Sequence, residues 1–311
     1  MDISLSRSLE LDFLKGVFIV LMVAFHLFYF SVHYPLLCSW VYTFHMPGFL
    51  LISGYLMRVN KELKKVLNSL RWLLVPYVLF ETLFFFGSTF LPISGTMPDH
   101  TVLGYFQMLL FKPLGNYWYL FSVFLYGICY LIVFRFVRLD LISRLFVLAF
   151  LFYILGVSGL VRHENSLYFF IGVVLRQTDI LFLNFFRPSW WAFPAIVLLA
   201  FNPVTLDRGT IGGLLTVFSV ISFLLVLYKY IPNRVKEWMV FLGRNSLIVY
   251  VYSPLFTNPC TKYLSSVLAF DSTRILFLVI ALPLSILGTI LVGKILDTLR
   301  ISHLLIGRRM Q

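Results

Sequence analysis

The 311-residue chain contains little charge. Asp, Glu, Lys and Arg make up 12% of it, against roughly 25% in a typical soluble domain. Hydrophobic residues make up 60%, and the mean hydropathy is +0.92. This composition excludes an ordinary soluble protein and predicts an integral membrane protein. The first apolar stretch runs to about Tyr34 without a small-residue cleavage site, so we expect a permanent anchor rather than a cleaved signal peptide.

Several catalytic patterns are also missing. The three cysteines, Cys38, Cys129 and Cys260, form neither a disulfide framework nor a metal-binding spacing, and we interpret them as small apolar packing residues. The sequence has no H-E-x-x-H zinc motif, nucleophile elbow, phosphate-cradling glycine loop or glycosidase-type carboxylate pair. We therefore expect no metal cofactor, and the available chemistry is a base, several cations and a cavity.

Apolar runs near twenty residues, separated by charges, Pro or Gly, predict an all-α polytopic membrane protein with about ten transmembrane helices. The predicted limits are 12–33, 36–57, 71–91, 117–137, 142–160, 165–185, 189–206, 210–231, 240–258 and 274–297. The run from Val102 to Phe111 is too short to cross, so we expect an interfacial or re-entrant segment there. We expect one transmembrane domain over residues 1–311, without an appended soluble domain.

The distribution of basic residues predicts the orientation. With ten spans, 20 of the 25 Lys and Arg residues fall on one side, which we assign as cytoplasmic together with both termini. This asymmetry accounts for the net charge of +12, so we expect no nucleic-acid partner. Lys61, Lys64, Lys65 and Arg71 follow the second span. They either attract a polyphosphate donor to the inner face or serve orientation and contact with membrane lipids.

Lys15 and His26 stand eleven residues apart within the first apolar stretch. At about 100° and about 1.5 Å per helical residue, they lie on one stripe and roughly 16 Å apart along the axis. An ionisable group at membrane depth is costly and marks a candidate functional site. A neutral imidazole suits a general base acting on a hydroxyl. The alternative is a histidine that hydrogen-bonds a neighbouring helix.

Three further segments carry candidate residues. His45 falls at a predicted depth similar to that of His26, and Pro47–Gly48 is expected to open the backbone beside it, while Ser53–Gly54 favours close helix packing. Glu81 lies within the third span and needs a partner, either Lys15 or Arg71, unless it orients a histidine. Trp118 lies at the outer end of the fourth span, where it belongs to an aromatic belt or stacks on a sugar ring.

These residues together resemble membrane acyltransferase family 3. The opening Arg7-x-x-x-Leu-Asp12-Phe-Leu-Lys15-Gly16, followed by His26, is similar to the first-helix pattern of that family, in which a basic residue stands eleven residues before a histidine. The second-helix signature of the family is similar to the segment from Phe44 to Tyr55. Weaker landmarks match 71–77, 118–120, 169–172 and 243–250. Family members often carry a histidine after the last of these, where this chain has Ser253-Pro254.

The resemblance implies a ten-helix membrane enzyme that uses a cytoplasmic acyl-CoA, usually acetyl-CoA, with His26 as catalytic base and Lys15 as a required cation. We expect O-acylation, in particular O-acetylation, of a sugar hydroxyl on a cell-envelope polysaccharide or lipid-linked glycan, in a bacterial inner or plasma membrane. His26 would remove the acceptor proton or carry an acyl group transiently, and His45 would orient His26 or the acceptor. Lys15 and Arg71 would hold the donor phosphates or polarise the thioester. The predicted substrate-binding set is Arg71, Glu81, Trp118 and Asp12.

Two other functions remain open from the sequence. Ten helices with buried His and Glu also suit a proton-coupled transporter or a flippase of a glycan precursor. The sequence shows no repeat between its halves and no paired broken helices, which disfavours transport. A non-catalytic membrane partner of a glycan-synthesis complex is the second alternative.

Overall fold

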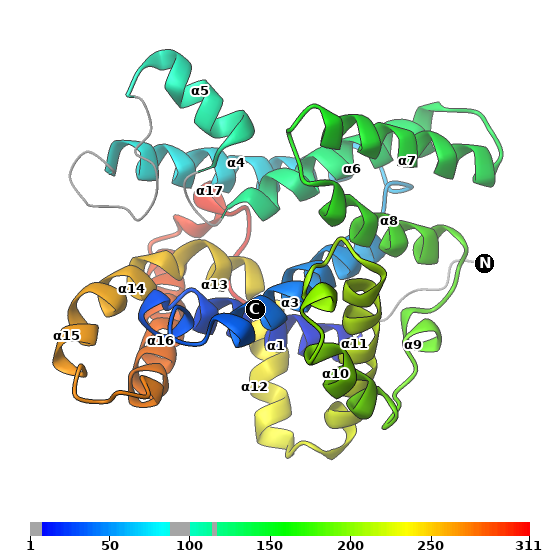
Figure 1. The fold of residues 1–311 in the computed structure, drawn as a ribbon. Coiled ribbons are helices and arrows are strands. Elements are labelled where there is room, and N and C mark those ends of the chain that lie inside the picture. Colours follow the sequence, from blue (N-terminus) through cyan, green and yellow to red (C-terminus); the bar gives the residue numbers. More distant parts are fainter. Residues whose placement is uncertain (1–7, 88–99, 114–116) are drawn as a thin grey trace. The chain divides into compact units, whose positions relative to one another are not determined.

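The computed structural model describes residues 8–87, 100–113 and 117–311 (Figure 1), and within these ranges the regular elements are helices. The α-helices are α1 (Leu9–Phe25), α2 (Phe28–Ser31), α3 (Pro35–Leu56), α4 (Leu63–Gly87), α5 (Val102–Phe111), α6 (Trp118–Phe136), α7 (Leu141–Val157), α8 (His163–Gln177), α9 (Phe182–Phe185), α10 (Ala192–Ala200), α11 (Ile211–Tyr230), α12 (Asn233–Arg244), α13 (Ser246–Tyr252), α14 (Pro254–Pro259), α15 (Ser265–Val267), α16 (Ile275–Thr298) and α17 (Ser302–Leu305). A 3₁₀ turn, Pro203–Leu206, and a π-helical turn, Cys260–Leu264, complete the set. The all-α prediction is confirmed for the part of the chain that the structure describes.

Five helices are long and apolar enough to cross a membrane, namely α3, α4, α6, α11 and α16. Helix α12 and the segment Ser246–Val267 give a sixth span if this pair, bent by 68°, is counted as one. Five or six of the ten predicted spans are thus supported among the described residues. The predicted span 189–206 does not form as one helix. The α-helix within it, α10, has only nine residues. Nine residues reach only about 14 Å, short of a hydrocarbon core of about 30 Å.

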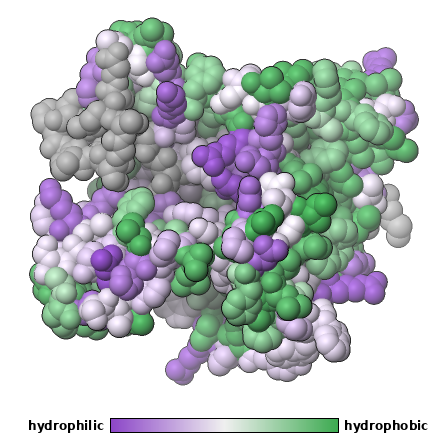
Figure 2. Space-filling model, viewed as in Figure 1, coloured by the Kyte–Doolittle hydropathy of each residue, from purple (hydrophilic) through white to green (hydrophobic). Residues whose placement is uncertain are grey.

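The helix surfaces are apolar where a soluble protein would be polar. Large hydrophobic side chains are exposed along α7 and α16; they include Phe146, Phe150, Tyr153, Leu284, Leu287 and Leu291. Hydrophobic residues cover much of the face that Figure 2 shows. Contiguous apolar surface of this kind suits contact with lipid chains.

The chain forms two compact units. The first comprises Met1–Phe49, Leu181–Ser302 and Arg308–Gln311, and the second comprises Leu50–Ile180 and His303–Gly307. In the first unit, α1 contacts α11, α12, α13 and α16, so it is the central helix. In the second unit, α6 packs against α4, α7 and α8.

The first predicted span is broken at the candidate base. Helix α1 ends at Phe25, and Leu27 leaves helical geometry with φ −79° and ψ 83° before α2 begins at Phe28. Carbonyls at the break find partners elsewhere in the unit. Tyr42 Oη donates to Phe25 O at 3.1 Å, and Arg274 Nη1 donates to Tyr29 O at 2.7 Å. A continuous helix over 12–33 was therefore a wrong expectation.

The expected opening of the second span is absent. Helix α3 continues through Pro47 to Leu56. A Cβ added to Gly48 would lie 2.4 Å from Cε2 of Phe18, so this glycine admits an aromatic ring of α1 instead of opening the backbone. The prediction of close packing at Gly54 is confirmed, because a Cβ there would lie 2.1 Å from Phe169 O in α8. Small residues let membrane helices approach in this way.

The short apolar run is a helix with the predicted limits, α5 (Val102–Phe111). In the second unit, Tyr77 Oη of α4 donates to Leu109 O of α5 at 2.5 Å, and the Tyr77 ring stacks on Phe121 with centroids 5.0 Å apart. The hydrogen bond fixes α5 against α4, and the ring stack packs α4 against α6. Residues 88–91 of the third predicted span and Arg7 of the first-helix pattern lie outside the described residues.

Candidate active site

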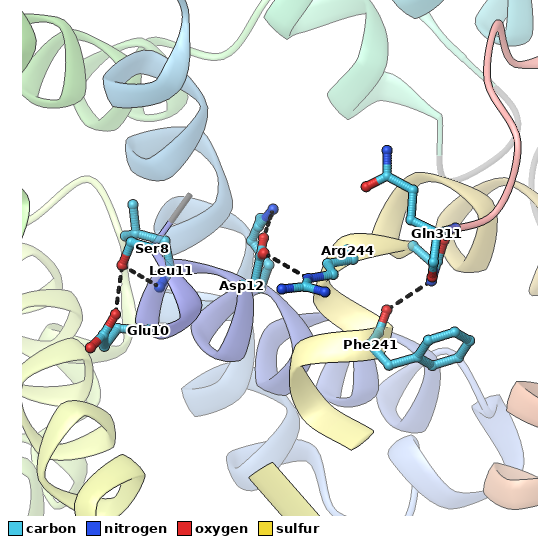
Figure 3. A network of polar contacts seen from close by, with 9 residues as sticks. Ser8, Glu10, Leu11, Asp12, Phe241, Arg244 and Gln311 are labelled. Carbon is cyan, nitrogen blue, oxygen red and sulfur yellow. Dashed lines mark hydrogen bonds and ion pairs between the residues drawn. The ribbon is translucent and has the colours of Figure 1, made fainter. Parts of the chain in front are cut away.

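Asp12 of α1 holds two cations. Lys15 Nζ lies 2.7 Å from Asp12 Oδ1, and their spacing of three residues puts both side chains on one helix face. Arg244 Nε, at the end of α12, donates to Asp12 Oδ2 at 3.3 Å. The Asp12 side chain is 3% exposed, against 18% for Lys15 and 35% for Arg244. Figure 3 shows Asp12 and Arg244 pointing toward one another from their two helices.

Two glycines let α1 and α12 come close enough for this contact. A Cβ on Gly16 would lie 1.9 Å from Met239 O, and a Cβ on Gly243 would lie 1.7 Å from Asp12 O. Both neighbours are backbone atoms, so neither can turn aside as a side chain could. The backbone contact between the helices therefore sets the position of Arg244 relative to Asp12.

The residue after Arg244 is fixed as well. Asn245 is buried at the bend between α12 and α13, and its Nδ2 donates to Phe241 O at 3.0 Å and to Gln311 O at 2.8 Å. Its Oδ1 accepts from Gln311 N at 2.9 Å. Figure 3 shows Phe241 and Gln311 at this end of α12. The amide pairing satisfies the backbone N–H and C=O of Gln311 and holds the chain directly beyond Arg244.

His26 stands at the other end of α1, as its C-cap. Its Nδ1 lies 2.6 Å from Met22 O. Because a carbonyl oxygen only accepts, Nδ1 carries the proton in this hydrogen bond, and Nε2 is the basic nitrogen of the neutral ring. Helix α1 is regular up to Phe25, so Lys15 and His26 keep their common face and their separation of about 16 Å along the axis.

His45 and Tyr42 lie beside His26. The Tyr42 ring centroid is 6.0 Å from that of His26 and 5.2 Å from that of His45. His45 Nδ1 donates to Val41 O at 2.7 Å, which again leaves Nε2 as the basic atom. That Nε2 is buried and has no hydrogen-bond partner among the described residues. An unsatisfied buried acceptor costs about 1–3 kcal/mol, so a hydroxyl that donates to it would be bound favourably.

The other predicted site residues belong to the second unit. Arg71 is exposed on α4, with its guanidinium 5.4 Å from the ring centroid of Trp72. Trp118 is the first residue of α6, is partly exposed and contacts the Tyr119 ring edge to face at 6.3 Å. Ser53 and Tyr119 share a hydrogen bond of 2.6 Å.

Glu81 is fully buried on α4. The expected pairing with Arg71 does not occur, because ten residues of continuous helix separate the two by about 15 Å. Lys15, the other expected partner of Glu81, forms an ion pair with Asp12 of α1.

No cluster of three or more His, Cys, Asp or Glu side chains able to hold a metal ion occurs in residues 8–87, 100–113 and 117–311. A family model, the acyltransferase domain of acyltransferase family 3, matches residues 8–294. The chain belongs to this family. Searches of curated proteins and of solved structures gave no significant match.

Family membership implies acyltransferase activity, an acyl donor and an acceptor, and it places the chain among membrane proteins. The apolar helices agree with that location. Membership also favours the acyltransferase interpretation over the transporter or flippase.

Sequence reasoning missed three residues that the structure places at the site: Arg244, Asn245 and Tyr42. Tyr42 stands three residues before His45 and therefore on the same helix face, a spacing that could have identified it. Arg244 and Asn245 lie within the landmark 243–250, but no local pattern links them to Asp12, which is 232 positions from Arg244.

Proposed function

We propose that this member of acyltransferase family 3 transfers an acyl group, acetyl in the simplest case, from an acyl-CoA to a sugar hydroxyl. The acceptor would be a cell-envelope polysaccharide or a lipid-linked glycan in a bacterial inner or plasma membrane. One observation carries this proposal: α1 presents the cation Lys15 near one end and a histidine with a basic Nε2 at the other, about 16 Å apart. In an acyl-CoA, the phosphates and the thioester carbonyl likewise lie at opposite ends of a long arm.

In the proposed reaction, His26 Nε2 accepts the proton of the acceptor hydroxyl while its oxygen attacks the thioester carbonyl carbon. The new C–O ester bond forms, the C–S bond breaks, and the sulfur leaves with the electron pair. The proton passes from His26 to the sulfur, giving free CoA thiol and regenerating the neutral ring. The Nδ1 hydrogen bond to Met22 O keeps the ring in the required tautomer throughout.

The neighbouring residues would support this step. His45 Nε2, buried and unsatisfied within the described residues, would accept a hydrogen bond from the acceptor sugar. Lys15 would attract the donor, and Asp12 would hold the cations, because its carboxylate contacts both Lys15 and Arg244. Arg71, Glu81 and Trp118 are proposed to bind substrate.

The test replaces His26 with Ala, with His33→Ala as matched control, because His33 is an exposed histidine shortly after the helix break. Cells lacking the gene would be complemented with each variant. Acyl groups on envelope glycans would be measured by mass spectrometry, and protein abundance by immunoblot. We expect loss of acylation with His26→Ala and retention with His33→Ala. Normal acylation by His26→Ala at normal abundance would refute the proposal.

A further inference from the structure

Only one nitrogen of the Arg244 guanidinium group contacts Asp12. Its Nε donates to Asp12 Oδ2, and within the described residues the Arg244 side chain makes this single hydrogen bond. The two Nη groups make no hydrogen bond in the part of the chain that the structure describes, and the side chain is 35% exposed. The buried carboxylate therefore anchors the arginine by one edge and leaves its two-pronged end accessible.

The local charges favour an anion at that end. Lys15 and Arg244 contribute two positive charges around the single negative charge of Asp12, so the cluster keeps one net positive charge. Guanidinium donors match the oxygens of a phosphate in a bidentate geometry, which a lysine cannot reproduce. A guanidinium held in place beforehand also loses little side-chain entropy on binding.

We propose that Arg244 binds a phosphate group of the acyl donor and that Asp12 is its positioning residue. The inference rests on the proposed function, since it needs a phosphate-bearing acyl donor. It adds a specific contact to the donor, made by α12, and gives the Gly16 and Gly243 contact between α1 and α12 a functional reason. Asn245, paired with Gln311, would hold the end of α12 in register for the same contact.

The experiment compares Arg244→Gln with Arg234→Gln, an exposed arginine ten residues earlier on the same helix. Each purified protein, reconstituted in nanodiscs, would be assayed with acetyl-CoA and with acetyl-pantetheine, which has the thioester but no phosphate. We expect the preference of wild-type protein for acetyl-CoA, measured as a ratio of kcat/KM values, to fall about tenfold or more in Arg244→Gln and to stay unchanged in Arg234→Gln. An unchanged ratio in Arg244→Gln would overturn the inference.

Further arms separate the remaining possibilities. If Arg244→Gln does not accumulate, Arg244→Lys keeps the charge without the fork, and the same fall in the ratio is expected. An anionic lipid headgroup is the other source of phosphate, so each assay would be run with and without anionic phospholipid. If Arg244→Gln lowers the ratio of kcat/KM values only in nanodiscs that contain anionic phospholipid, the inference would be overturned. Loss of acyl transfer by His26→Ala alongside an unchanged ratio in Arg244→Gln would leave the proposed function standing while this inference fails.

Discussion

Replacing Gly243 with Ala tests whether the contact between α1 and α12 builds the cation cluster. The added Cβ would lie 1.7 Å from Asp12 O, 2.7 Å from Asp12 C and 2.9 Å from Gly16 N. All three are backbone atoms of α1. To bring the shortest distance to 3.4 Å, where ordinary contact begins, the backbones must separate by about 1.7 Å.

This separation acts on one ion pair and spares the other. If Arg244 moves with α12, its Nε–Oδ2 distance to Asp12 grows from 3.3 Å to about 5 Å, beyond hydrogen bonding. Lys15 shares α1 with Asp12, so their pair at 2.7 Å is retained. Loss of a charge-assisted hydrogen bond to the donor is worth about 1.5–3 kcal/mol, which corresponds to roughly a tenfold to hundredfold rise in donor KM.

The assay would measure KM separately for donor and acceptor in nanodiscs, together with the midpoint of thermal unfolding. Overpacking itself is expected to cost about 1–3 kcal/mol of stability, so stability is measured beside kinetics. Gly87→Ala is the control, because a Cβ there has nothing within 4 Å. A donor KM within about twofold of wild type in Gly243→Ala would show that α12 does not position the donor and would refute the reasoning.

Two further predictions concern Tyr42 and Asp271 of the first unit. Tyr42→Phe removes the hydrogen bond to Phe25 O at the helix break, so we expect kcat to fall about threefold to tenfold without a change in donor KM; an unchanged kcat would contradict this. Hydrogen bonds from Thr273 and from Leu276 N hold the pKa of Asp271 below its ordinary value. Its stabilisation is therefore present above the ordinary carboxyl pKa and lost as pH falls. The unfolding midpoint of Asp271→Asn should lie below that of wild type at neutral pH and approach it only below about pH 4, as pH falls through the lowered pKa; a constant gap would contradict this.

The sequence allowed several uninterrupted helices to be predicted well. The limits predicted for α5 match, and those for α3, α6, α11 and α16 differ by one residue at each end. The predicted spans 71–91 and 165–185 fit less well, because α4 already begins at Leu63 and α8 already ends at Gln177. The length of an apolar run and the charges that bound it are local properties, and they determine such helices. The nine-residue α10 was missed because apolar residues continue past it into the 3₁₀ turn, so composition alone did not mark its end.

The helix breaks could not be predicted from local sequence. Proline favoured a break at Pro47, yet α3 is continuous there and α1 is broken at His26 instead. The break at His26 is stabilised by partners from other elements, Tyr42 and Arg274. A break in a membrane helix is tolerated where its backbone groups find such partners, and these depend on tertiary structure.

The candidate site shows the same division between local and distant information. The Asp12–Lys15 pair follows from a spacing of three on one helix, whereas Arg244 reaches Asp12 only because Gly16 and Gly243 face each other. The surroundings of His26 also depend on contacts between helices. Gly48 of α3 admits the Phe18 ring of α1 and so lets α3, which carries Tyr42 and His45, pack against that helix. Helix α1 thus carries Lys15 near one end and His26 at the other, and both α12 and α3 approach it at glycines. Because Lys15 and His26 are fixed on one rigid helix whereas Arg244 belongs to α12, a change that moves α12 should weaken donor binding and leave the histidine geometry intact.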